Sequence, residues 1–217
     1  MNQPQEKRTD YKIQPFFSIW LHPKKTAQFI LEHKNWTYTI GFILLGGIAT
    51  GISELEDTKL YPSFQTWLLL LACIITGPFI GAVSVAIGTA VTWIVGKIFG
   101  GKGSFEDIWK VTSVSSIPSI AITPFLIVWM ANSPQTFFDT NYESSTIILN
   151  IAAFASLLIS TIVSVWSLVI NIAGIAVAHR FSNWKAFFTI FIPTFLLIVV
   201  IGILGLLLYS AFSGISI

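Results

Sequence analysis

The side chains that could do chemistry are few and lie far apart along the chain. The three histidines, His22, His33 and His179, are isolated and form no His-Glu-x-x-His arrangement. The single cysteine, Cys73, lies in an apolar run, as a buried and inert thiol would. A serine nucleophile would need a neighbouring base, and the apolar runs contain no His or Lys. We therefore expect no catalytic, cofactor or metal site, and predict that the protein is not an enzyme.

One segment superficially matches a nucleotide-binding loop. Gly96, Gly101 and Lys102 fit the spacing G-x-x-x-x-G-K, but the next residue is Gly103 where a magnesium-binding Ser or Thr belongs. An apolar helix, rather than a strand, precedes the segment, so we reject this interpretation. Ser104 and Asp107 instead have the spacing of a helix N-cap followed by an acidic residue three positions later.

Two amides, Asn150 and Asn171, lie well inside an apolar run. Side-chain amides in hydrocarbon usually form hydrogen bonds between helices, and we expect that role here. Contact with a substrate is the alternative.

The amino-acid composition indicates the structural class of the protein. Apolar residues make up 54% of the 217, charged residues only 10%, and the mean hydropathy is +0.77. A soluble domain usually has about a quarter of its residues charged, so most of this surface must face lipid. The net charge of +2 is too small to suggest nucleic-acid binding. We predict an all-α integral membrane bundle.

The charges divide the chain into spans. About 20 apolar residues cross a hydrocarbon core roughly 30 Å thick. The gaps between charge clusters predict five transmembrane helices, all free of Asp, Glu, Lys, Arg and His, at about 36–53, 67–96, 111–131, 147–178 and 186–212. They form one membrane domain, 36–217, after a polar tail, 1–14, and an interfacial segment, 15–35. Kinks are expected at Pro78, Pro118, Pro124 and Pro193.

Every basic residue except Lys59 falls on one side of these spans. The positive-inside rule places that side in the cytoplasm, so we predict the N-terminus inside and the C-terminus outside. The first 14 residues lack the apolar core of a cleavable signal peptide. On the predicted inner side lie Lys7, Arg8, Lys12, Lys24, Lys25, Lys34, Lys97, Lys102, Lys110, Arg180 and Lys185.

Residues 15–35 have the pattern of an amphipathic helix. Ala27, Ile30 and Leu31 share one face, and Pro23 suits the first turn of a helix. We expect this helix to lie on the cytoplasmic leaflet, with its lysines meeting anionic headgroups. A docking surface for a cytosolic partner is the alternative.

Small residues recur on one side of the second span. Their spacing of three or four residues predicts close helix packing, within the bundle or between two copies in a homodimer. The stripe comprises Gly77, Gly81, Ser84, Gly88, Thr92 and Gly96, and the first span offers Gly47 and Gly51 opposite it.

Three motifs, in this order and spacing, resemble the Yip1-domain family of small multi-pass membrane proteins. The first resembles the family's I-W-x-x-P-[KR]-x-T segment, the second its bacterial G-G-K-G-S-F loop, and the third its S-x-P. Here they are residues 19–26, 100–105 and 116–118. The resemblance covers nearly the whole chain and, with the short N-terminal tail, implies a bacterial member. Eukaryotic members are regarded as adaptors linked to Rab GTPases; GTPase binding is not carried over, since bacteria lack that machinery.

We therefore expect a non-enzymatic scaffold or adaptor in the bacterial cytoplasmic membrane, whose cytoplasmic face contacts lipid or protein partners. The alternative is a small-molecule transporter, permease or immunity-type protein with a cavity between kinked helices, suggested by Pro118, Pro124 and the two asparagines. The residues expected to form the cytoplasmic interaction surface are Trp20, Pro23, Lys24, Lys25, Thr26, Gly100, Gly101, Lys102 and Gly103.

Overall fold

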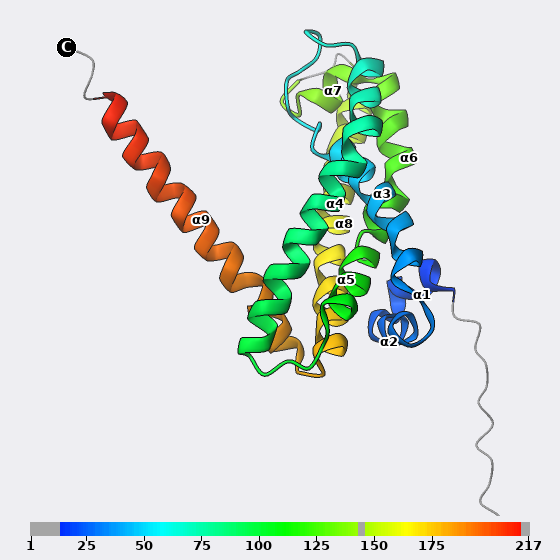
Figure 1. Ribbon diagram of the computed structural model, residues 1–217. Helices are drawn as coiled ribbons and strands as arrows, with labels where there is room; N and C mark the ends of the chain where they lie inside the picture. Colours follow the sequence, from blue (N-terminus) through cyan, green and yellow to red (C-terminus); the bar gives the residue numbers. More distant parts are fainter. Residues whose placement is uncertain (1–13, 143–145, 214–217) are drawn as a thin grey trace, which may run out of the picture.

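The computed structural model describes residues 14–142 and 146–213, and within them the chain forms nine α-helices and no strand (Figure 1). The all-α prediction is confirmed. The helices are α1 Pro15–Leu21, α2 Pro23–His33, α3 Trp36–Ser53, α4 Thr66–Ile98, α5 Phe105–Val114, α6 Ile117–Asn132, α7 Pro134–Phe138, α8 Ile147–His179 and α9 Asn183–Ser213.

Five stretches are long and apolar enough to cross a membrane, as the charge pattern predicts. They are α3, α4, α5 with α6, α8 and α9, and their mean hydropathy runs from 1.3 to 2.9. Helix α3 has the predicted bounds, while α4 and α8, with 33 residues each, exceed what a bilayer needs. Such long helices must tilt or project beyond the hydrocarbon.

The third span begins earlier than expected and is broken in its middle. Helix α5 starts at Phe105 because Ser104 and Asp107 form a capping box, with Asp107 N–H donating to Ser104 Oγ at 3.1 Å. The helix is interrupted at Ser115 and Ser116, since Pro118 lacks an N–H and its ring would clash with the carbonyl of Val114. The two serine hydroxyls donate to the carbonyls of Thr112 and Ser113, at 2.6 and 2.8 Å.

The earlier start of this span brings charged residues into it. Lys110 was expected just outside the third span, but it lies inside α5, is only 7% exposed, and forms an ion pair with Glu106 at 2.8 Å. The first turns of α5, which the predicted N-cap at Ser104 begins, therefore hold charges that lie before the predicted start of the span at residue 111.

The segment before the first span forms two helices instead of one. The chain turns at His22, and Pro23 begins α2, as expected for a proline in a first turn. Thr26 Oγ1 lies 2.9 Å from both Ser18 Oγ and the carbonyl oxygen of His22, which joins the two helices.

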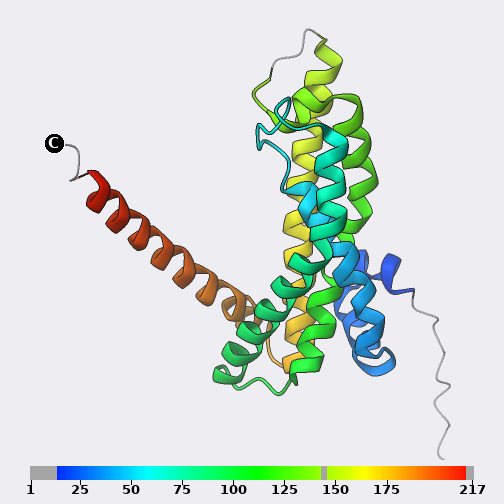
Figure 2. The same ribbon diagram turned by 45° about the horizontal axis from the view of Figure 1, so that its top comes forward.

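The apolar face of these two helices is turned towards the protein. Ile19 and Ile30 are buried in one cluster with residues of α5, α6 and α8, and Ala27 is buried in a second. The bundle therefore covers Ile19, Ala27 and Ile30, and contact of these helices with the lipid headgroups stays a prediction. Figure 2 shows α1 and α2 packed beside the lower ends of α3 and α5.

Helices α3 and α4 approach through their glycines. A methyl group on Gly47 would overlap the carbonyl of Gly77, and one on Gly81 would lie 2.6 Å from the Cα of Gly47. Only residues without a side chain allow the two backbones to come this close.

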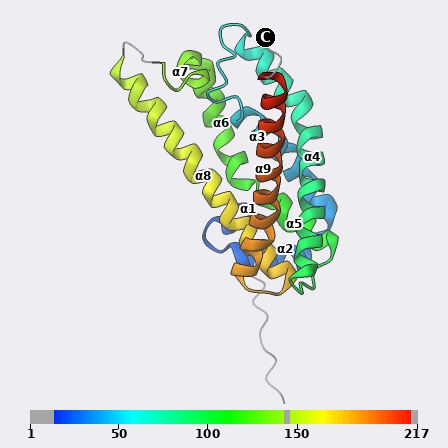
Figure 3. The same cartoon turned by 90° about the vertical axis from the view of Figure 1, so that its left-hand side faces the viewer.

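Helix α9 leaves the bundle after its first turns (Figures 1 and 2), and in Figure 3 it is seen in front of the other helices. Ala186 and Thr189 are buried, whereas residues 194–212 are all exposed. Such an apolar helix, unpacked along most of its length, has its side chains available to lipid or to another membrane segment.

Candidate binding site at the basic end of the bundle

One end of the bundle carries α2, the loop of residues 99–104 and the turn from α8 to α9; we call it the basic end (Figure 1). The loop begins where α4 stops. Gly100 has a φ of 80°, and the N–H groups of Gly100 and Gly101 donate to the carbonyls of Lys97 and Gly96, at 2.9 and 2.8 Å. This is a Schellman motif, in which a glycine in the left-handed region ends the helix.

The loop closes around His179, the last residue of α8. His179 is fully buried, its carbonyl accepts the N–H of Lys102 at 3.0 Å, and its Nδ1 accepts the N–H of Gly103 at 3.3 Å. The other ring nitrogen, Nε2, faces the backbone of α4 at Gly96. A methyl group on either Gly96 or Gly101 would overlap the imidazole ring.

The glycines therefore seat a histidine and leave Lys102 exposed. His179 is isolated in the sequence, and its role in the loop is not predicted from its neighbours. The available signal was the spacing of Gly96, Gly101 and Gly103, since three glycines close together often mark a place where backbone approaches another group closely.

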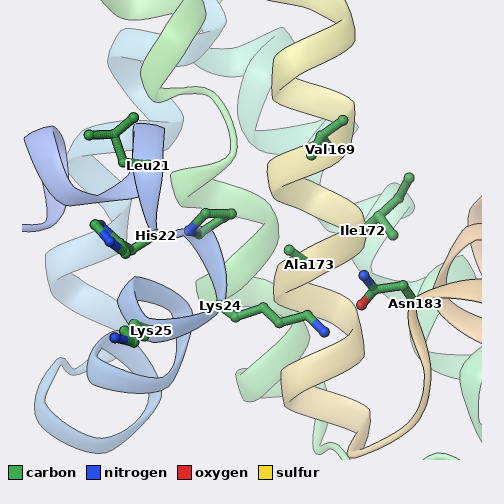
Figure 4. A pocket seen from close by; sticks show the side chains of 9 residues that line it. Leu21, His22, Lys24, Lys25, Val169, Ile172, Ala173 and Asn183 are labelled. Carbon is green, nitrogen blue, oxygen red and sulfur yellow. The ribbon is translucent and has the colours of Figure 1, made fainter.

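A pocket of about 450 Å³ lies on the other side of α8, between this helix and the short helices α1 and α2 (Figure 4). Its apolar wall comprises Val169, Ile172 and Ala173 of α8. The opposite wall and the mouth are formed by Leu21, His22, Pro23, Lys24 and Lys25, with Asn183 at the start of α9.

Lysine side chains give this pocket its charge. In Figure 4 the Lys24 side chain extends across the pocket towards α8 and Asn183. Lys24 and Lys25 are both exposed, and none of the lining residues is acidic. The arrangement offers ammonium groups and an amide to an anionic group and a hydrocarbon wall to whatever is attached to it.

The structure divides the predicted interaction residues into two groups at this end. Pro23, Lys24 and Lys25 line the pocket, whereas Gly100, Gly101, Lys102 and Gly103 form the loop around His179. Trp20 and Thr26 do neither. Trp20 packs against the core cluster that holds Ile19, and buried Thr26 joins α1 to α2.

The small-residue stripe is also divided. Gly77 and Gly81 contact α3. A methyl group added to Gly51 of α3 would make an ordinary contact with Cys73. Thr92 and Gly96 are buried near His179. Between these two groups, Ser84 is exposed and Gly88 faces open space, where an added methyl group would have no neighbour within 4 Å.

The two amides of α8 occupy different positions. Asn150 lies in the first turn, close to the end of the helix, rather than deep inside the span. Asn171 lies deeper, and its Oδ1 is buried without a hydrogen-bond partner among the described residues. In the described part of the chain, no group of three or more His, Cys, Asp or Glu side chains could hold a metal ion.

Comparison with known proteins gives one match. The family model for the Yip1 domain matches residues 17–204, which is most of the chain. The chain belongs to the Yip1 family. The matched region of this Yip1-family protein includes the pocket, the glycine loop and the first part of α9. Neither a curated protein nor a solved structure gives a significant match.

Proposed function

We propose that this Yip1-family protein is a non-enzymatic membrane scaffold whose basic end binds an anionic phospholipid and presents the neighbouring surface to a protein partner. The observation that carries the proposal is the pocket between α2 and α8, which joins a lysine mouth to an apolar wall. A phospholipid has the same two parts in the same order.

The chemistry of the pocket supports a lipid headgroup. A lysine ammonium is a strong partner for phosphate, and each lysine near an anionic membrane surface contributes about 1 kcal/mol. Val169 and Ile172 lie along a helix whose neighbouring residues Val165 and Ile162 are also exposed, so an acyl chain would continue along α8. Because α1 and α2 form the opposite wall, a bound lipid would hold them against the bundle.

The distribution of charge supports the orientation of this site. The predicted location is the bacterial cytoplasmic membrane, with the basic end in the cytoplasm and the C-terminus outside. The inner leaflet is the leaflet whose anionic lipids meet juxtamembrane lysines. Lys102, which is exposed on the loop around His179, offers a charged side chain to a protein partner at this end.

The lipid site is tested by removing the two pocket charges together, with Lys24→Gln and Lys25→Gln. In nanodiscs of phosphatidylcholine, titrated phosphatidylglycerol should bind the variant about 30-fold more weakly, from about 1 kcal/mol for each lysine. Native mass spectrometry would count the retained lipids.

The matched control removes two charges from the same end but outside the pocket, with Lys97→Gln and Lys102→Gln. Both lysines are exposed. Equal loss in the two variants would mean that general surface charge, and not the pocket, attracts the lipid, and this would reject the proposed site.

A second candidate function, transport of a small molecule, is favoured by one observation. A polar pocket lies between the end of α3, the first turns of α6 and the middle part of α8. In a transporter such a pocket would hold the substrate between helices that are broken or contain proline. Uptake into proteoliposomes would support this candidate.

A further inference from the structure

The polar pocket between α3, α6 and α8 has a lining unlike the rest of the bundle. Its volume is about 420 Å³, and most of its lining side chains carry oxygen. Two are carboxylates, Glu54 and Glu56, and none is basic. The other lining residues are Thr50, Ser53, Ser119, Ile122, Ser160, Thr161, Val163, Ser164 and Val165.

The carboxylates reach the pocket because α3 is short. Helix α3 ends well before the level at which α4 begins and α6 ends (Figure 1). The chain continues from there as a loop, residues 54–65, which rises to α4. The first residues of the loop are therefore recessed between longer helices.

One hydrogen bond shows how far Glu56 is recessed. Its Oε1 accepts from Ser160 Oγ at 3.0 Å. From Ile147, where α8 begins, to Ser160 is roughly 20 Å at about 1.5 Å per residue. Glu56 belongs to the loop after α3, yet its carboxylate lies beside the middle part of a spanning helix.

A carboxylate in such a place needs compensation. An ionised group away from bulk water is costly unless it is paired or well hydrogen-bonded. Burial raises the pKa of Glu56, the hydrogen bond from Ser160 lowers it, and the charge of Glu54 raises it, with a net upward shift. The hydroxyl of Ser160 thus offsets only part of the cost, and no lining cation supplies the rest.

We propose that this pocket binds a small organic cation carrying primary ammonium groups, with the charge at Glu54 and Glu56 and the carbon chain against Ile122, Val163 and Val165. An ammonium group donates three hydrogen bonds, which the carboxylates and the hydroxyls of Ser160 and Ser164 can accept. The pocket volume exceeds what a bare metal ion needs. A bare ion would also make no favourable contact with the apolar side chains of the lining. A divalent metal would take only oxygen ligands and would leave the three apolar side chains without a role.

This inference does not depend on the scaffold proposal, and it supplies the binding step of the transport candidate. The two can fail separately. Binding of the cation without uptake into proteoliposomes would keep the site and reject transport.

The test measures binding to the full-length protein in a neutral detergent. The probe is 1,4-diaminobutane, followed by the rise of the melting temperature with its concentration at neutral pH. We expect a saturable rise, because a ligand that binds only the folded protein stabilises it. Neutral 1,4-butanediol and sodium chloride of equal ionic strength should produce no such rise.

Two variants locate the site. Glu56→Gln should weaken binding on the order of tenfold or more, since it removes a charged partner. Glu54→Gln should also weaken it, and because Glu54 is exposed this variant keeps the test valid if Glu56→Gln unfolds the protein. The matched control is Glu32→Gln, an exposed carboxylate at the basic end, and it should bind like the unsubstituted protein.

The proposal is overturned by any of three results. The first is an equal rise with sodium chloride or 1,4-butanediol. The second is an equal rise with magnesium chloride, which would indicate a metal site. The third is unchanged binding by both Glu54→Gln and Glu56→Gln.

Discussion

His179 and Glu56 are two ionisable residues whose roles depend on partners distant in the sequence. Gly103 donates to the ring of His179 across 76 residues, and Ser160 donates to Glu56 across 104. Neither residue stands out in the sequence, because nothing within a few positions of it forms a chemical pattern. His179 lies at one end of the bundle, and Glu56 lies in a loop that reaches the middle part of α8.

Asp57 gives a prediction at the residue scale. Its carboxylate Oδ1 accepts the N–H of Thr140 at 3.0 Å, and this bond to the charged form lowers the pKa of Asp57 below its ordinary value. A lowered pKa in the folded state stabilises the fold above the ordinary pKa of about 4, and that contribution is lost as the pH falls through the lowered value.

We therefore expect Asp57→Asn to lower the melting temperature at pH 7 and to have progressively less effect as the pH falls below about 4. Thermal unfolding in detergent across this range measures the difference. Asp139→Asn removes the same charge from an aspartate of the adjoining loop whose Oδ1 accepts the N–H of nearby Asn141, and serves as the control. A difference between the unsubstituted protein and Asp57→Asn that stays constant from pH 7 to pH 3 would contradict the assignment.

At the scale of the helices, glycine has different consequences along a single element. Gly77 and Gly81 of α4 contact the backbone of α3 at Gly47, while Gly88, two turns further along α4, faces open space. The stripe of small residues read from the sequence is continuous, but the contact is not. Helix α4 diverges from α3 and meets His179 at its other end.

Two alanine substitutions test this division. Gly47→Ala should destabilise the protein by about 1–3 kcal/mol, since the methyl group overlaps the backbone of α4 and must displace it. Gly88→Ala should have no such cost and should stabilise by up to about 1 kcal/mol, because alanine is the better helix former. Unfolding by a denaturing detergent compares the two.

Equal effects of the two substitutions would mean that α3 and α4 do not meet through Gly47. A gain in stability for Gly88→Ala with a loss of oligomers would instead indicate that the exposed side of α4 contacts a second copy. A homodimer, which the stripe predicted as an alternative, would then use this surface.

For the whole molecule, the arrangement of charge predicts orientation. Among the described residues, Lys59 is the one basic residue on the side of the bundle that carries α7, and the other described basic residues share the opposite side. We expect the chain end after Ile217 to lie outside the cytoplasm. A C-terminal alkaline phosphatase fusion should be active, and a green fluorescent protein fusion at the same place should be dark.

Insertion of an additional lysine pair into the loop of residues 54–65 provides the control, since added positive charge should reduce the correctly oriented fraction. Fluorescence from the C-terminal fusion of the unsubstituted chain would reverse the orientation. It would also place the lysine pocket outside and remove the argument for inner-leaflet lipid.

The sequence by itself determined the membrane class, the number of spans and most of their bounds. Hydrocarbon excludes unpaired charge, so the positions of Lys, Arg, Asp and Glu mark where the chain leaves the bilayer, and this is readable without knowing what any residue touches. The capping box at Ser104 and the helix start at Pro23 could be predicted for a different reason. Their partners lie within four positions along the chain.

Only the tertiary structure decided which residues distant in the sequence come into contact. In the folded protein, apolar residues of α1 and α2 pack against the bundle, and His179 lies within the glycine loop. Glu56 accepts a hydrogen bond from Ser160. These contacts follow from helices of unequal length packed at an angle. Hydropathy gives the length of each helix but not its tilt or its neighbours, so residues 76 and 104 positions apart meet without a local sign.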